Sequence, residues 1–177
     1  MIDADGYRHN VGIVIINSAN NILLAKRCKQ QMWQLPQGGI NENEKTKEAL
    51  FRELYEEVGL KNEDVKLIAK TPKWLKYDIP EQYLRKYQRP LCVGQKQVWY
   101  LLKLVANDNK IRFNTHLNQE FDACKWVDYW EPIKEVIDFK RNIYEDMLKI
   151  LAPVVFGDNV TVPKSFTRPV KNQPILF

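Results

Sequence analysis

Apolar residues along this chain form continuous runs that predict buried strands, and shorter sets whose spacing predicts helices. The β-branched run at residues 11–16 is followed by a polar turn and an apolar run at residues 22–26, and together they predict a hairpin. In the second half, residues 95–105 (QKQVWYLLKLV) and 120–129 (EFDACKWVDY) predict two more strands. Further strands are predicted at residues 64–70 and 73–79.

Three segments predict helices. Residues 45–58 contain no proline, carry apolar residues at helical spacing and precede Gly59, a residue type that commonly ends helices. Residues 130–132 (WEP) open a second helix, because proline is favoured in a first turn. A last helix is predicted at residues 139–151. Its apolar face consists of Ile143, Met147, Ile150 and Leu151.

Length and composition favour one globular domain in a reducing compartment. The chain has 177 residues, and no apolar run approaches the ~20 residues that span a bilayer. Its first ten residues are polar and do not resemble a signal peptide. The three cysteines, Cys28, Cys92 and Cys124, are widely spaced, which favours reduced thiols in a cytoplasmic protein over disulfides or a zinc site. His9 and His116 are too few for a histidine-based metal site.

The positive charge of the chain is concentrated in one segment. The whole chain has a net charge of +5, and residues 70–96 alone hold seven cations against two anions. The same segment contains Trp74, Tyr77, Tyr83 and Tyr87. Cations interleaved with aromatic side chains suit phosphates and unpaired bases. The alternative is a solvated basic loop whose aromatic residues are buried.

The last residues, 153–177, combine prolines with an excess of cations and predict an extended or loosely packed tail without a core of its own. The cations after Asp158 are Lys164, Arg168 and Lys171. They are candidates for weak phosphate contacts, and the alternative is a tail without a binding role.

Carboxylates gather on the predicted helix at residues 45–58. Glu53, Glu56 and Glu57 are spaced i, i+3 and i+4, so they share one face, where like charges repel. A hard divalent cation such as Mg²⁺ or Mn²⁺ would relieve that repulsion, whereas the alternative is a solvated acidic surface. Glu120, which begins a strand after a polar loop, is a candidate fourth carboxylate or another exposed side chain. Arg27 ends a strand, where its charge could face a cleft.

The segment at residues 38–60 resembles the signature of the Nudix hydrolases at every defined position. Its defined residues are Gly38, Glu44 and the run Arg52-Glu53-Leu54-x-Glu56-Glu57-x-Gly59-Leu60. The resemblance implies an α/β Nudix fold over residues 1–152, with a mixed sheet sandwiched between helices (α/β/α) and a signature loop–helix–loop. It implies hydrolysis of a nucleoside diphosphate linked to another group, with Mg²⁺ or Mn²⁺ at the helix and more than one ion when substrate is bound.

The same resemblance implies roles for individual residues. The metal ligands would be the Gly38 backbone, Glu53, Glu56, Glu57 and Glu120. Catalytic candidates are Glu53, Glu57 and Glu120, and the residues do not decide which is the general base. Arg52 cannot lose its proton, so we expect it to hold Glu44 or Glu53 in place.

Outside the signature, residues 1–151 resemble the bacterial RNA pyrophosphohydrolases. The likeness is carried by MIDADGYRHNVGIVI, WQLPQGGIN, GQKQVWYLL, EFDACKWV and FKR. Those enzymes convert 5′-triphosphorylated or diphosphorylated RNA to a monophosphate, a 5′-end processing step that exposes mRNA to decay. Carried across, the phosphate-binding residues would be Arg8, Arg27, Gln95 and Lys140, and the base-binding residues Tyr77, Ile137 and Phe139. A base would stack between Arg27 and Ile137. Each could instead be an ordinary surface or core residue.

Three functions are therefore considered. The first is an RNA 5′-pyrophosphohydrolase. The second is a dinucleoside polyphosphate hydrolase, acting on substrates such as diadenosine tetraphosphate or pentaphosphate at the same site. The third is a non-catalytic Nudix module that binds RNA or protein, which the presence of Glu53, Glu56 and Glu57 disfavours. A stimulating protein partner remains unidentified.

Overall fold

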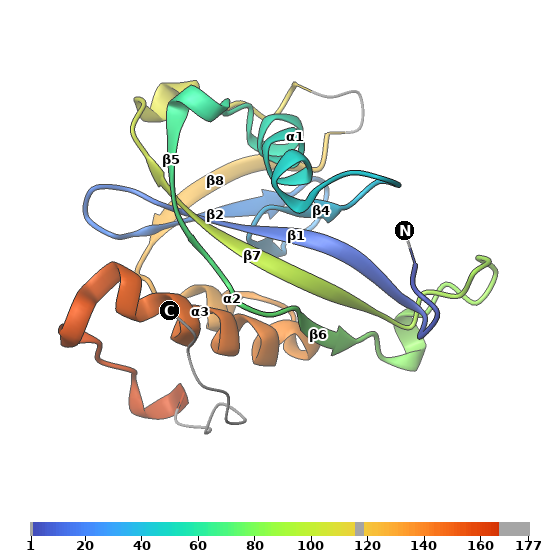
Figure 1. Cartoon of the computed structure of the whole chain (residues 1–177). Coiled ribbons are helices and arrows are strands. Elements are labelled where there is room, and N and C mark those ends of the chain that lie inside the picture. The colour runs from blue at the N-terminus through green and yellow to red at the C-terminus, as the bar shows by residue number, and fades with distance from the viewer. Residues whose placement is uncertain (1, 116–118, 167–177) are drawn as a thin grey trace.

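The computed structural model is a three-layer α/β arrangement in which a mixed sheet separates helix α1 from helices α2 and α3 (Figure 1). It describes residues 2–115 and 119–166. His116, Arg168 and Lys171 lie outside the described residues. Two apolar cores fill the spaces on the two sides of the sheet, one beneath α1 and the other beneath α3. This layered arrangement is the α/β class expected from the sequence.

In the described part of the chain the sheet contains eight strands, ordered β3-β2-β1-β7-β5 along its main path. Off this path, β4 pairs with β1, β6 with β7 and β8 with β2. The strands are β1 (Tyr7–Ile16), β2 (Ile22–Arg27), β3 (Trp33–Gln34), β4 (Gln37–Gly39), β5 (Val65–Lys70), β6 (Leu75–Asp78), β7 (Gly94–Leu104) and β8 (Phe121–Val127). The central pair, β1 and β7, is parallel, and the other pairs are antiparallel.

The predicted hairpin between the first two strands is only partly correct. Strands β1 and β2 occur where the apolar runs predict them, but their register contains a single pair, Ile16 with Ile22. Beyond the turn, β1 pairs along its length with β7, and β2 pairs with β8. The long-range pairs thus replace the local hairpin as the framework of the sheet.

Helix α1 (Thr46–Val58) forms where the sequence predicts it. Its start is capped by the Glu48 carboxylate, which accepts a hydrogen bond of 3.0 Å from the Lys45 backbone N–H. Its end is closed by Gly59, whose φ of 71° is left-handed and favours glycine. Leu50 and Leu54 are fully buried against the sheet, which fixes the orientation of α1 about its own axis.

Helices α2 (Pro132–Glu135) and α3 (Arg141–Phe156) cover the other face of the sheet. The predicted end of the last helix at residue 151 is wrong, because α3 continues past Pro153 to Phe156. The tail, predicted to be extended or loosely packed, therefore begins with four α-helical residues and a 3-10 turn at Gly157–Asn159, and Phe166 is buried in the core beneath α3. Phe139, predicted to begin this helix, lies in a 3-10 turn at Asp138–Lys140 instead. No helix among the described residues is long and apolar enough to cross a membrane.

Candidate active site

The carboxylates of α1 differ strongly in burial. The Glu57 side chain is almost completely buried and that of Glu53 nearly so, whereas Glu56 is half-buried. Buried carboxylates are costly unless hydrogen-bonded or neutralised. The acidic face is thus no ordinary solvated surface, which was the alternative for these residues.

Glu57 is held by the strand that precedes the helix. The backbone N–H of Gln37 donates to Glu57 Oε2 at 2.7 Å, while Glu57 Oε1 is buried without a partner among the described residues. Burial raises the pKa of Glu57 well above its usual range, and the nearby charges of Glu120 and Glu53 raise it further. An unpaired buried carboxylate oxygen is an available ligand for a cation.

Gly38 lies directly against Glu53. A β-carbon at residue 38 would be 1.8 Å from the carboxylate carbon of Glu53, so only glycine leaves room for it. Burial raises the pKa of Glu53, an effect that the neighbouring Arg52 guanidinium opposes. The backbone of Gly38 and the Glu53 carboxylate are consequently neighbours, and their role as ligands of one cation stays a prediction.

Arg52 connects the loop before α1 to the carboxylates on the helix. Its Nε donates to Glu44 Oε1 at 2.7 Å, and its Nη2 donates to the Gly39 carbonyl at 2.7 Å. Its Nη1 donates to Glu53 at 2.6 Å and to Glu56 at 3.2 Å. The guanidinium therefore contacts both of the acidic residues, Glu44 and Glu53, that were considered as its partners.

Glu120 reaches the same site from the start of β8. Its carbonyl accepts a hydrogen bond of 2.8 Å from the Cys28 N–H, which fixes its backbone beside the end of β2. Its side chain forms an ion pair of 3.3 Å with Arg27. Because the charge of Glu120 raises the pKa values of both Glu53 and Glu57, the three carboxylates belong to one electrostatic cluster.

Lys140 is a buried cation beside this cluster. Only 9% of its surface is exposed, and burial together with the charge of Arg27 lowers its pKa to about 8. The charges of Glu57 and Glu120 oppose that lowering, so all three groups lie within electrostatic reach of Lys140. Its Nζ lies 5.7 Å from the centroid of the Tyr77 ring. Lys140 thus supplies a buried positive charge within electrostatic reach of these carboxylates.

Three predicted substrate-binding residues lie in one row across the sheet. In the parallel pairing of β1 with β7, Arg8 is opposite Gln95, and Gln95 is in turn opposite Tyr77 on β6. The Arg8 guanidinium lies against Gly39, since a β-carbon there would be 2.3 Å from Arg8 Nη2. Arg8 therefore reaches from β1 to the end of β4, where the chain leaves the sheet toward α1.

The base-binding candidates form an apolar wall beside that row. The rings of Tyr77 and Phe139 are 5.8 Å apart between centroids. Ile137 and Phe139 are half-buried and pack against the core beneath α3. The predicted stacking of a base between Arg27 and Ile137 is not tested by these contacts and stays a prediction.

The sequence-based reasoning missed two glutamines that connect the site. Gln97 is fully buried on β7, and its Nε2 donates to Gln37 Oε1 and to Gln95 Oε1, each at 3.0 Å. Gln37 thereby links Gln97 to Glu57, which its backbone holds. The available signal was the polar position within the apolar strand at residues 95–105.

The predicted metal ligands are of the chemical type that a hard divalent cation prefers. Their oxygens are carboxylates and a backbone carbonyl, and one buried oxygen, on Glu57, has no partner within residues 2–115 and 119–166. Among the described residues no group of three acidic, histidine or cysteine side chains is already arranged as a cation site. Arg52 and the Gln37 N–H instead hold oxygens of Glu53 and Glu57. Binding a cation would therefore require these carboxylates to shift.

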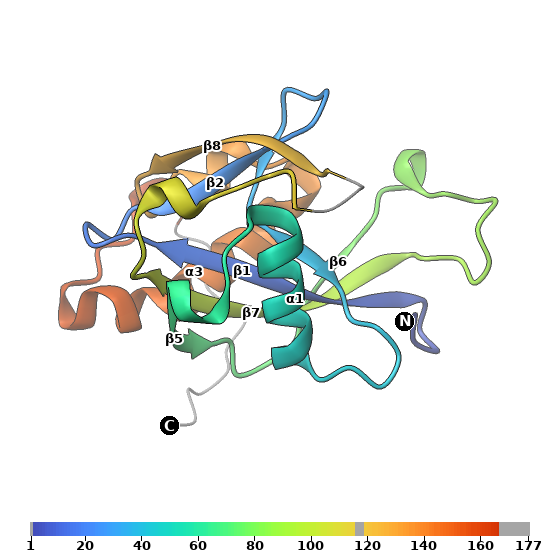
Figure 2. The ribbon, with the colours of Figure 1, turned by 90° about the horizontal axis from the view of Figure 1, so that it is seen from above.

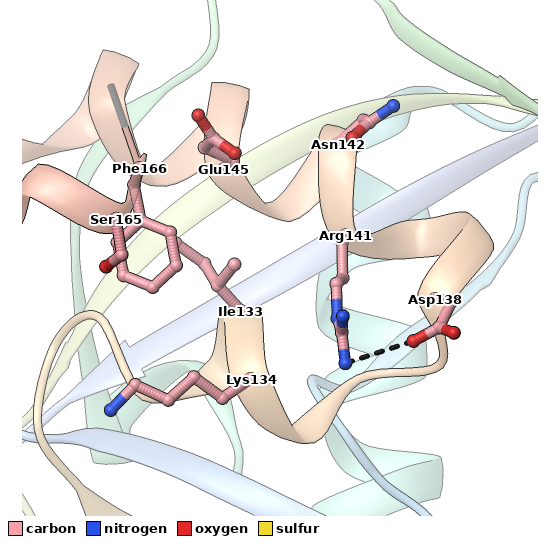
Figure 3. Close-up of a pocket in the computed structure, with 8 residues that line it drawn as sticks. All are labelled: Ile133, Lys134, Asp138, Arg141, Asn142, Glu145, Ser165 and Phe166. Atoms are coloured by element: carbon pink, nitrogen blue, oxygen red, sulfur yellow. Dashed lines mark ion pairs between the residues drawn. The ribbon is translucent and has the colours of Figure 1, made fainter. Parts of the chain in front are cut away.

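A separate cavity of about 520 Å³ lies between α2, α3 and the turn that contains Phe166 (Figure 3). Ile133 and Phe166 supply its apolar surface, and Arg141 at its edge pairs with Asp138 at 3.0 Å. It contains none of the predicted site residues, so we do not assign it to the catalytic site.

Comparison with known proteins identifies relatives of the chain. A family model described as NUDIX domain matches residues 6–147. The chain is 56% identical over its full length to an RNA pyrophosphohydrolase of Ruthia magnifica subsp. Calyptogena magnifica, covering 99% of that protein. It is 49% identical over 90% of its length to an RNA pyrophosphohydrolase of Haemophilus influenzae (strain PittEE), covering 81% of that protein.

Solved structures share the fold at low sequence identity. The E. coli dihydroneopterin triphosphate pyrophosphohydrolase aligns with a TM-score of 0.60 at 21% identity, over 81% of this chain and 97% of that chain. A C. elegans Ap4A hydrolase binary complex aligns with a TM-score of 0.61 at 19% identity, over 84% of this chain and 97% of that chain. At these identities the likeness supports the fold alone.

Proposed function

The chain belongs to the Nudix hydrolase family, and from this premise we propose that it is a metal-dependent RNA 5′-pyrophosphohydrolase. It would remove pyrophosphate or phosphate from 5′-triphosphorylated or diphosphorylated RNA and leave a 5′-monophosphate. The names of its relatives, which are 49% and 56% identical over most of the chain, support this substrate.

The observation that carries the proposal is the placement of cations beside a buried carboxylate, Glu57, and an exposed one, Glu120. Lys140 and Arg27 lie within electrostatic reach of Glu57 and Glu120, and the Arg8–Gln95–Tyr77 row continues the polar surface across the sheet. Guanidinium and ammonium groups bind phosphate oxygens, and the carboxylates suit a divalent cation. A phosphate chain can therefore be held where its anhydride bond would be cleaved.

The carboxylates and the carbonyl would hold Mg²⁺ or Mn²⁺. The ligand set we propose is the Gly38 carbonyl, Glu53, Glu56, Glu57 and Glu120. When bound, the cation supplies neutralisation of phosphate charge and a more acidic bound water. Arg52 contributes by positioning, because its Nη1 donates hydrogen bonds to both Glu53 and Glu56. Glu53, Glu57 and Glu120 are the candidates for accepting the proton of the attacking water.

The cationic residues would bind the terminal phosphates, and the apolar wall would bind a base. Arg8, Arg27, Gln95 and Lys140 would contact the phosphates. Tyr77, Ile137 and Phe139 would contact the first bases of an unpaired 5′ end. Because an RNA 5′ end carries phosphates and stackable bases together, it matches both parts of this surface.

The test is conversion of a 5′-triphosphate RNA to a 5′-monophosphate RNA in the presence of Mg²⁺. We expect conversion by the native chain and a loss of at least about 100-fold with Glu53→Gln. Lys134→Ala, an exposed lysine outside the site, is the matched control. Absence of product, or unchanged turnover by Glu53→Gln, would overturn the assignment.

A dinucleoside polyphosphate is the second candidate substrate, since it also combines a phosphate chain with stackable bases. One reaction containing both triphosphate RNA and diadenosine tetraphosphate decides between them. Faster RNA conversion at matched concentration supports the RNA assignment. Faster cleavage of the dinucleotide would make the small molecule the preferred substrate.

A further inference from the structure

A basic loop projects from the sheet next to the proposed site. This basic loop, residues 84–90, follows the 3-10 turn Glu81–Tyr83 after β6 and leads back into β7. Figure 2 shows the segment as a projection beyond β6 and β7. It contains four residues suited to nucleic acid, namely Arg85, Lys86, Tyr87 and Arg89. Neither the phosphate-binding nor the base-binding set proposed above includes any of them.

Aromatic contacts lead from the site to the basic loop. Lys140 lies over the Tyr77 ring, and the Tyr77 ring contacts Phe139 at 5.8 Å between centroids. Phe139 in turn contacts Tyr83 at 5.4 Å. Tyr83 immediately precedes the loop, so a chain of rings connects the phosphate-binding lysine with residues 84–90.

The aromatic residues at the end of this path are unusually exposed. Tyr83 is 53% exposed and Tyr87 is 81% exposed, whereas Tyr77 is buried. A tyrosine ring exposed to this extent contributes little to the core, and its flat face is free to stack on a base. The exposure therefore increases outward along the path, in the direction that an emerging strand would follow.

The charges of the basic loop are available to phosphates. The Arg85 side chain has no hydrogen bond or ion pair with the described residues, and Lys86 has only an exposed pair with Glu81. Arg89 Nη1 donates to the carbonyls of Lys86 and Gln88 at 2.7 and 2.9 Å, which fixes the shape of the loop. Arg85 is thus a free cation on a shaped loop.

We propose that the basic loop binds the single-stranded RNA that lies 3′ of the nucleotides in the active site. Tyr87 stacks on a downstream base, and Arg85 contacts a backbone phosphate. The ligand class is an unpaired RNA segment, which the loop recognises without reading its sequence. This inference rests on the proposed function, because it concerns the body of the same substrate.

A second exposed aromatic group provides a control on the other face of the sheet. The Trp74 ring lies 5.1 Å from the ring of His9. His9 shares one face of β1 with Val11 and Ile13, which pack in the core beneath α1. Arg8, the residue next to His9, and its partner Gln95 lie on the opposite face of the sheet. Trp74 and the adjacent Lys73 thus match Tyr87 and Arg85 in chemistry but lie away from the path.

The experiment compares two substrate lengths. The substrates are triphosphate RNAs of two and of about ten nucleotides, because ten exceeds the ~4 nucleotides of the smallest single-strand sites. Conversion of each is measured with the native chain, Tyr87→Ala, Arg85→Ala and the control Lys73→Ala/Trp74→Ala. We expect Tyr87→Ala to lower kcat/KM about tenfold on the long RNA only, as loss of one base stack does. Arg85→Ala should reduce the salt dependence of long-RNA affinity by about 0.7 in log–log slope.

The outcomes separate this inference from the function on which it rests. If the native chain converts neither RNA, the proposed function itself fails. If it converts both, and the loop variants behave as the control does at each length, the downstream site is refuted and the function stands. Equal loss on both lengths would also refute it, because the loop would then act at the 5′ end.

Discussion

Lys140 offers a test of whether a site residue is retained at a cost to stability. The residue is only 9% exposed, and burial holds its pKa at about 8 instead of the ordinary 10.5. Charging it in the folded chain is therefore opposed relative to the unfolded chain. Replacing it by methionine keeps a similar length and removes the charge.

The magnitude follows from the difference between the two pKa values. At 1.36 kcal/mol per pKa unit, the buried charge of Lys140 costs about 3 kcal/mol of stability. Below pH 8 both states are protonated, so the whole cost is present. Between pH 8 and 10.5 the unfolded chain binds more protons, so stability rises with pH and the cost disappears above 10.5. At pH 9.5 about 1.5 kcal/mol should remain.

The measurement is urea unfolding of the metal-free protein at pH 7 and 9.5. We expect Lys140→Met to raise the free energy of unfolding by up to about 3 kcal/mol at pH 7 and by about half of that at pH 9.5. The control is Lys134→Met, whose exposed lysine should change stability by less than about 0.5 kcal/mol. The same Lys140 variant should bind triphosphate RNA at least about tenfold more weakly.

Two results would refute this reasoning. A Lys140→Met chain less stable than the native one at pH 7 would mean that contacts of the ammonium outweigh its burial. A gain in stability that is equal at both pH values would mean that it arises from packing and not from the buried charge.

Three further predictions concern the carboxylates. Mg²⁺ should raise Tm more at pH 8 than at pH 5.5, because the raised pKa values of Glu53 and Glu57 let protons compete with the cation; an equal Mg²⁺-dependent rise in Tm at the two pH values in thermal melts would contradict it. Gly38→Ala should displace Glu53 and lower kcat/KM about 100-fold in steady-state assays. Normal turnover would contradict this, because it would show that Glu53 can move away from residue 38 without loss of activity. Arg52→Lys keeps the charge but cannot make all the contacts of the guanidinium fork, so activity should fall about 10- to 100-fold; full activity would exclude the positioning role.

The elements set by local pattern could be predicted from sequence. Helix α1 was correctly placed because its apolar spacing, its lack of proline and Gly59 all indicate the same boundaries. The carboxylates on that helix were correctly expected to share a face, since helical geometry fixes their spacing. Glu120 joins them only through β8, and the prediction of its role relied on the family resemblance.

Features decided by tertiary packing could not be predicted in the same way. Pro153 removes a backbone donor, which favours a helix end, yet α3 continues because Val155 and Phe156 pack against the core. Gln37 and Gln97 meet only in the folded sheet, so nothing in their local sequence shows that they bond. Local patterns therefore predicted elements, whereas the connections between them required the structure.

The parallel pairing of β1 with β7 has a consequence for the order in which the protein can assemble. Arg8 lies near the start of the chain and Gln95 in its second half, and they become neighbours only when these strands pair. A chain emerging from the ribosome must therefore extend past β7 before the pair of Arg8 and Gln95, proposed here to bind phosphate, exists. Contacts of such long range slow folding, so the nascent protein would remain inactive until this central pair closes.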